Sequence, residues 1–264
     1  MTMDLDARWE RWCAAYDASY RDITTLFHNR HVWLTIEEMW KAPTAIELNT
    51  IVINWFTRLY VVTQVAGVRR ECDAGADTSS LRWCLDELVK FPQIASRVRY
   101  EAAIDEDPAR DDELKASVKV GFELFSGQGQ PHIDAQLVQA DIDTLATTFN
   151  TVRSYTNKIL LHRQRNGATL GLSLSWEELD TALNVVGAML KRYYRLRHPG
   201  SILGNLAPEL PLGWMAPFEV PWLPDGFVPL SARPVEDHVG PARRGSGGEN
   251  TSGEDDSEPT ESDS

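Results

Sequence analysis

The chain has 264 residues, of which 42% are hydrophobic, enough for one large domain with a buried core. Its formal net charge of -13 argues against a general nucleic-acid binder, because phosphate contacts need clustered Lys and Arg, but it leaves room for a local basic site. The three cysteines, Cys13, Cys72 and Cys84, form no CxxC pair and argue against a disulfide framework. A reducing, cytoplasmic location is therefore expected.

Neither a secretory signal nor a membrane span is expected. Residues 1–12 are charged and aromatic, without the apolar segment of a signal peptide. The most apolar stretch, residues 46–68, carries polar side chains that include Asn49, Asn54, Arg58 and Gln64. A bilayer-spanning helix needs about 20 mostly apolar residues, so this stretch is interpreted as a core helix.

Two helices are predicted in the first part of the chain. Apolar residues recur at steps of three and four from Leu5 to Phe27, which is typical of a long amphipathic helix. After Pro43, a second helix is predicted from about Thr44 to Arg70. Its apolar side chains occupy most of its circumference, which predicts a central position in a bundle.

Shorter helices are predicted in the middle of the chain. Their expected ranges are Leu81–Lys90, capped by Ser79 or Ser80, then Pro92 to about Ala103, and about Glu113–Phe125. A polar loop, residues 105–112, separates the last two, and the sequence SGQGQP at 126–131 ends the third.

Two long helices complete the predicted bundle. The first runs from about Asp134 to Arg165, with a buried stripe that begins at Ile142 and continues through Thr156 to Ile159. The second opens with Ser175 and Glu178, a capping-box pattern, and extends to about Arg197. No convincing strand is found, so the sequence predicts an all-α bundle of about six helices within residues 1–198.

The C-terminal part has a different composition. Residues 199–234 contain eight of the 14 prolines, which excludes a long helix. Their interleaved aromatics, Trp214, Phe218, Trp222 and Phe227, predict an extended segment packed on the bundle. Residues 235–264 carry nine acidic residues and two Arg, and are expected to form a disordered tail. A solubilising tail is the favoured interpretation, over one that binds a basic partner.

Metal and cofactor motifs are weak or absent. His28 and His31 form an HxxH pattern near Glu37 and Glu38, but no second half-site accompanies them. The sequence contains no HExxH, Walker, GxGxxG or GxSxG motif. We therefore expect no metal and no cofactor.

The segment Thr156–Arg163, with the sequence TNKILLHR, resembles a family motif. In HEPN domains of the AbiU-like abortive-infection group, a late helix carries Arg-Asn/Asp-Lys-x-x-Ala-His-Arg. Segments 68–85 and 175–193 also resemble the flanking parts of that family. The resemblance implies a HEPN-like bundle that acts in phage defence.

The resemblance also implies roles for individual residues. Active HEPN ribonucleases use an Arg and a His, usually across a symmetric dimer and without metal. By this comparison His162 would transfer protons, with Asn157 and Lys158 beside it in the catalytic motif. A substrate-binding role falls to three further residues: Tyr155, Arg163 and Arg165.

The sequence departs from this motif at the Arg position, which Thr156 occupies. Arg153 lies nine residues before His162, on about the opposite face of a helix, and is a poor substitute. A metal-independent ribonuclease of weak or absent activity is therefore expected.

Three functions stay open. The chain acts on or binds RNA or a nucleotide, or it is a non-catalytic protein-interaction module, such as one component of a paired defence or toxin–antitoxin system. The third alternative is a structural dimer. A homodimer is expected, because the basic runs at 153–165 and 191–197 would lie at opposite ends of a helical hairpin and only a second chain could unite them.

Overall fold

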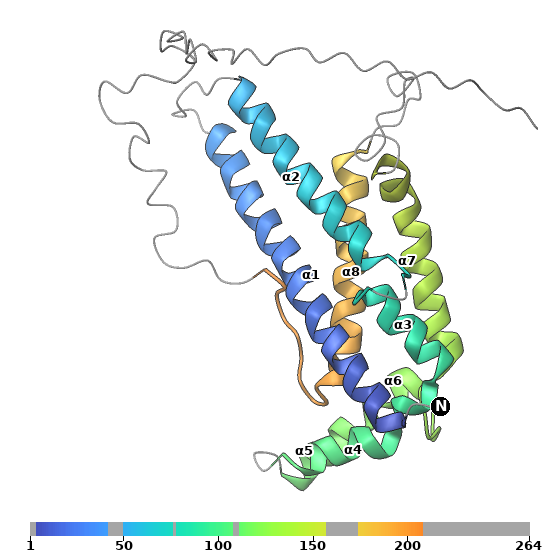
Figure 1. Cartoon of the computed structure of the whole chain (residues 1–264). Helices are drawn as coiled ribbons and strands as arrows, with labels where there is room; N and C mark the ends of the chain where they lie inside the picture. The colour runs from blue at the N-terminus through green and yellow to red at the C-terminus, as the bar shows by residue number, and fades with distance from the viewer. Residues whose placement is uncertain (1–3, 42–49, 76–77, 108–110, 157–173, 208–264) are drawn as a thin grey trace, which may run out of the picture. The chain divides into compact units, whose positions relative to one another are not determined.

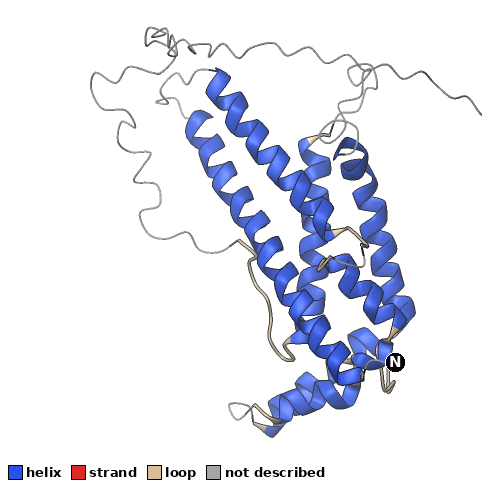
Figure 2. Ribbon diagram, in the orientation of Figure 1, coloured by secondary structure: helices blue, strands red, loops and turns tan. Residues whose placement is uncertain are grey.

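The computed structural model describes residues 4–41, 50–75, 78–107, 111–156 and 174–207. These residues belong to one compact unit, and their regular elements are helices (Figures 1 and 2). Within these ranges no strand is present, and a single isolated β-bridge joins Ser96 to His132. The prediction of an all-α bundle is confirmed.

Four columns of helix build the bundle. Three are single long helices: α1 (Leu5–Lys41), α7 (Ala135–Tyr155) and α8 (Trp176–Arg197). The remaining column is made of two helices, α2 (Thr50–Glu71) and α3 (Leu81–Lys90), and α3 continues the line of α2 (Figure 1). Both halves of this column pack against α1 and α7.

Shorter elements cover one end of the bundle: the 3-10 turn η1 (Pro92–Ile94), α4 (Arg97–Asp105), α5 (Asp112–Val120) and α6 (Glu123–Ser126). The predicted helix from Pro92 to Ala103 is therefore two elements, because Ser96 adopts an extended conformation and caps α4 by accepting the Arg99 N–H. The predicted helix at 113–125 is also divided, at Gly121. Neither break had been expected from the periodicity.

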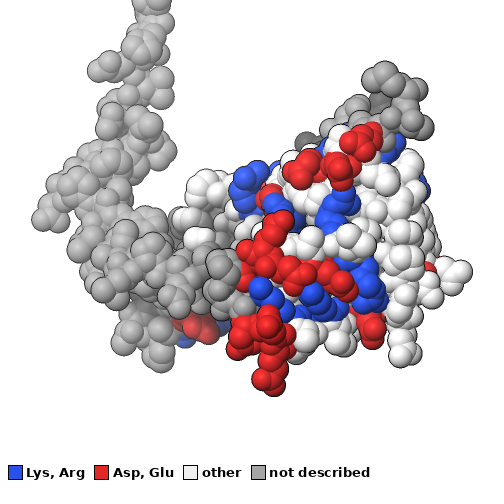
Figure 3. Space-filling model, turned by 90° about the horizontal axis from the view of Figure 1, so that it is seen from below, with Lys and Arg blue, Asp and Glu red and all other residues white. Residues whose placement is uncertain are grey.

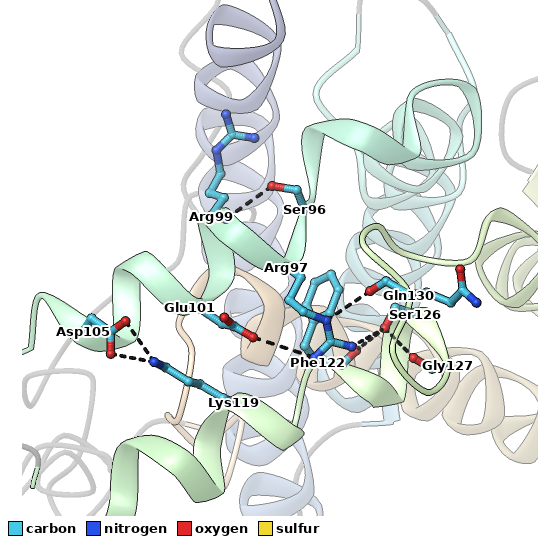
Figure 4. Close-up of polar contacts among 10 residues, drawn as sticks. All are labelled: Ser96, Arg97, Arg99, Glu101, Asp105, Lys119, Phe122, Ser126, Gly127 and Gln130. Atoms are coloured by element: carbon cyan, nitrogen blue, oxygen red, sulfur yellow. Dashed lines mark hydrogen bonds and ion pairs between the residues drawn. The ribbon is translucent and has the colours of Figure 1, made fainter. Parts of the chain in front are cut away.

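Polar contacts hold this end together (Figure 4). Arg97 Nε donates to the Gln130 carbonyl at 3.1 Å, and its guanidinium lies over the Phe122 ring. Lys119 Nζ lies 2.8 Å from Asp105 Oδ1. Acidic and basic side chains are interleaved on the surface at this end (Figure 3), so it presents no field of one sign.

Buried polar contacts join the columns. On α1, Trp12 Nε1 donates to the Cys84 carbonyl at 3.0 Å, and the Tyr16 hydroxyl donates to the Leu190 carbonyl at 2.6 Å. Both side chains are fully buried. They tie α1 to α3 and to α8, and their hydrogen bonds satisfy polar atoms that would otherwise be costly to bury.

The predicted helix caps are confirmed. Ser80 accepts the Trp83 N–H at the start of α3, and Ser175 with Glu178 forms a complete capping box at the start of α8. The predicted start of the second helix at Thr44 lies outside the described residues.

The second helix is not central, which corrects the expectation from its composition. One side of α2 packs against α1, α7 and α8. On the other side, the side chains of Val52, Trp55, Leu59 and Val62 are 38%, 57%, 46% and 37% exposed. The bundle needs only one face of this helix, so the second apolar face is left on the surface. None of the described helices is long and apolar enough to cross a membrane.

The chain after α8 begins its return along the bundle. Leu206 is buried, and its side chain lies with Phe27 of α1 near Gly187 of α8. The remaining Pro-rich segment, including Trp214, Phe218, Trp222 and Phe227, lies outside the described residues, as does the acidic tail.

Candidate functional site

Most of the HEPN-like motif lies outside the described residues: Asn157, Lys158, His162, Arg163 and Arg165. Their proposed catalytic and substrate-binding roles stay predictions. Tyr155 and Thr156 are described at the end of α7. Tyr155 is half-buried and packs against the hydrophobic core.

Thr156, at the position of the motif Arg, belongs to the core. Its side chain is only 2% exposed, and its hydroxyl donates to the Val152 carbonyl at 2.7 Å. Arg153 is exposed, on a different side of α7. The side chain of an Arg at position 156 would begin inside the core, where a charged group is costly to bury. The bundle therefore accommodates Thr156 better than the Arg that the motif requires.

The other sequence candidates do not assemble into a catalytic or metal centre. On α1, His28 is half-buried and His31 is exposed, while Glu37 pairs with Lys41 at 2.8 Å. In the part of the chain that the structure describes, no three His, Cys, Asp or Glu residues are placed to hold a metal ion. Burial raises the pKa of Cys13 and of Cys72 to about 12, which keeps both thiols protonated and poorly nucleophilic at neutral pH.

The basic run on α8 is partly neutralised. Arg192 Nη1 lies 2.9 Å from Asp141 Oδ1, and Arg197 Nη2 lies 3.3 Å from Asp17 Oδ2. Lys191, Arg192 and Arg195 line a pocket of about 390 Å³ whose other walls include Leu124 and Phe125 of α6. Because α7 and α8 are antiparallel, this pocket lies at the opposite end of the bundle from Thr156, as the hairpin prediction required.

Aromatic side chains gather at the end where α8 begins. Trp33 stacks on Tyr60, with ring centroids 5.0 Å apart, and on Trp176, with centroids 6.0 Å apart. Arg30 makes two hydrogen bonds to the carboxylate of Asp180, at 2.8 and 2.7 Å. The three rings join α1, α2 and α8, and among them only the Trp176 ring is half exposed.

The clearest surface feature is the outer face of α2. Five apolar residues on this face are exposed, and we call them the α2 stripe: Val52, Trp55, Leu59, Val62 and Ala66. They alternate at steps of three and four, the spacing by which one helix presents a seam to another. The stripe extends for about 21 Å along the helix axis.

The aromatic residue of the stripe, Trp55, is held by its neighbours. The Trp55 ring meets the Phe56 ring edge to face, with centroids 5.1 Å apart. The Phe56 ring in turn packs against the Trp40 ring of α1, with centroids 5.9 Å apart. An exposed Trp that is supported in this way loses little further side-chain freedom when another molecule covers it.

The sequence carried a signal for this surface that the composition alone obscured. The buried face of α2 includes Tyr60, Gln64 and Val68, whereas the stripe lies on the other side of the helical circumference. Two separate apolar faces on one helix give the same composition as a helix buried on all sides. The steps of three and four from Val52 to Ala66 mark the stripe in the sequence, but a helix buried on all sides contains the same spacing.

Comparison with known proteins identifies no relative: no protein family, curated protein or solved structure matches this chain.

Proposed function

We propose that this chain is a helical protein-interaction module whose α2 stripe binds an amphipathic helix of a partner protein. The observation that carries the proposal is the continuous exposed apolar seam at heptad spacing. A helix-in-groove or helix-on-helix contact recognises its partner through residues at i, i+3, i+4 and i+7. Contiguous exposed apolar surface of this kind typically marks an interaction site.

The composition of the stripe supports binding rather than solubility. Trp is the residue most enriched among those that dominate binding energy, and Trp55 lies between Val52 and Leu59 along the stripe. Burying a large apolar side chain stabilises a complex by about 1.5–3 kcal/mol. Trp55 and the aliphatic residues beside it therefore contribute favourably to a complex that covers them, against the entropy cost of association.

Ribonuclease activity is the less favoured proposal. The resemblance to HEPN proteins supports a role in phage defence, and a paired system would supply the partner. The buried Thr156 in place of the motif Arg supports weak or absent cleavage, because removing one preorganised group that stabilises developing charge typically lowers the rate by about 10²–10³.

RNA or nucleotide binding is favoured by one observation, the half-exposed Trp176 ring on the stack formed by Trp33 and Tyr60. Bases stack on aromatic rings of this kind. Titrating the protein with a labelled single-stranded RNA, with Trp176→Ala as the comparison, tests this second candidate. Affinity that does not change on loss of the ring would remove it.

Position-specific crosslinking in the native cells tests the interaction module. A photoreactive residue would be placed at position 59 in the stripe, and in a control protein at position 90, an exposed site on α3. We expect a discrete adduct with another protein from position 59, none from position 90, and loss of the adduct when Trp55→Ala is added. Identical adducts from both positions, or an adduct with a second copy of the chain, would overturn the proposal.

A further inference from the structure

The exposed charges that α2 itself carries are of one sign. Arg58 and Arg70 are exposed, and Arg69 is half-buried. The only acidic residue of α2, Glu71, is fully buried and accepts the Leu81 N–H. The exposed face of this helix therefore combines an apolar seam with cations and lacks any carboxylate of its own.

Two of these cations are available to a partner. Arg70 is already engaged, since its Nη2 lies 2.9 Å from Asp22 Oδ2 of α1. Arg58 and Arg69 make no ion pair with any residue that the structure describes. By helical geometry both lie along the same edge of the stripe, about 16 Å apart along the axis.

A second copy of this chain does not complement that edge. In an antiparallel pair centred on Leu59, the Arg58 side chains of the two copies would face one another. A parallel pair would offer each Arg58 no carboxylate from the opposite α2. Like charges at such flanking positions disfavour a pairing, and opposite charges set partner choice.

We infer that the α2 stripe takes a partner helix whose apolar seam is flanked by acidic residues spaced to reach Arg58 and Arg69. This inference rests on the proposed function and names the chemistry of the partner. The net charge of the whole chain is negative, but at physiological ionic strength exposed charges further than about 8 Å apart are largely screened. The arginines beside the seam therefore decide the local preference.

The test uses the full-length protein and two synthetic helices. Both helices carry the same Leu and Ile seam and a fluorescent label, and they differ in having Glu or Lys at every flanking position. Fluorescence anisotropy measures both affinities at low and at physiological salt. We expect the Glu helix to bind about fivefold or more tightly than the Lys helix, with the difference shrinking as salt rises.

Matched variants assign the preference to the arginines. Arg58→Glu should reduce or reverse the preference for the Glu helix, whereas Lys90→Glu, the same charge change on α3, should leave it as in the wild type. Leu59→Gln, which interrupts the apolar seam without adding a charge, should weaken both helices alike. Unchanged thermal midpoints would show that the variants are folded.

The outcomes separate this inference from the proposal on which it rests. If both helices bind equally and Leu59→Gln weakens both, the stripe is a docking surface but the acidic preference is wrong. A preference that survives Arg58→Glu would also overturn the inference. If neither helix binds, or if light scattering shows that the protein dimerises through Leu59, both proposals fail.

Discussion

The two helices of the divided column meet solvent in different ways. The outer face of α3 is polar, with Arg82 and Asp86 paired at 3.0 Å and Lys90 exposed at its end. The outer face of α2 is the apolar stripe around Trp55 and Leu59. Both helices lie in the same column and pack on α1 and α7, so the packing of the bundle does not require this difference. An apolar face that the fold does not use points to use by another molecule.

The largest expected effect contrasts one leucine from each helix. Leu85 of α3 is fully buried, and Leu85→Ala should lower the free energy of unfolding by about 2–5 kcal/mol through lost burial and the cavity left behind. Leu59→Ala on the stripe should change it by about 0.5 kcal/mol or less. Urea denaturation of both variants measures this contrast, and a loss at Leu59 as large as that at Leu85 would show that α2 is covered within the monomer.

The next effect concerns α7, against which both halves of the column pack. Thr156→Arg would replace a short buried side chain by a long charged one, and should lower the free energy of unfolding by about 3 kcal/mol. Thr151→Arg, on the exposed side of the same helix, serves as the control. Equal thermal midpoints for the two variants would contradict the burial of Thr156.

A smaller effect is expected at the junction between α2 and α3. Ser80 caps α3 through the Trp83 N–H, and its own hydroxyl donates to the Asp73 carbonyl at 2.6 Å. Ser80→Ala should lower the free energy of unfolding by about 1–2 kcal/mol. Thr78, half-buried just before the cap, offers a neighbouring control, since Thr78→Ala removes only its bond to the Gly75 carbonyl. Chemical denaturation of both variants measures the difference, and an equal loss of stability in the two would contradict a capping role for Ser80 at the start of α3.

The smallest effect depends on pH and on Glu71 at the same junction. Burial raises the pKa of this carboxyl above its usual value of 4.5, while contacts with Ser19 and the Leu81 N–H act in the opposite direction. A raised pKa means that the protonated form suits the folded state. Stability from this group is therefore present below pH 4.5 and is lost as the pH rises through the folded-state pKa.

Glu71→Gln removes that dependence and keeps an acceptor for the Leu81 N–H. Its thermal midpoint relative to wild type should rise as the pH increases from 4 to 8, and a tenfold change in proton affinity corresponds to about 1.4 kcal/mol. The variant Glu87→Gln, at a half-buried surface carboxylate of α3, provides the comparison. A constant difference between wild type and Glu71→Gln over this range would contradict the raised pKa.

Local signals in the sequence predicted the helices well. The caps at Ser80 and Ser175 and the buried stripe of α7 follow from side chains within a few positions of one another, and they are confirmed. The division at Ser96 was missed because its cap depends on a single serine inside an otherwise helical pattern. Such choices are made by tertiary contacts, here the bridge between Ser96 and His132.

The candidate site was much less predictable. The motif comparison directed attention to His162, which lies outside the described residues. The position of Thr156 on the buried stripe of its helix was predicted from the periodicity and is confirmed. The apolar character of α2 was visible in the sequence, but periodicity alone does not say which of two apolar faces the bundle covers. That choice depends on how α1, α7 and α8 surround the helix.

The break in the column also divides the molecule into parts that can open separately. Hydrogen exchange typically reveals cooperative units that follow such boundaries. The half around α3 is closed by the polar contacts of Trp12 and Ser80, whereas α2 exposes one of its faces along its length. Amide protons of α2 should therefore exchange faster than those of α3, through a partial opening in which α3 and the helices around it stay folded. A helix bound to the stripe would slow that exchange, so the exchange rate of the α2 amide protons would report whether the stripe is occupied.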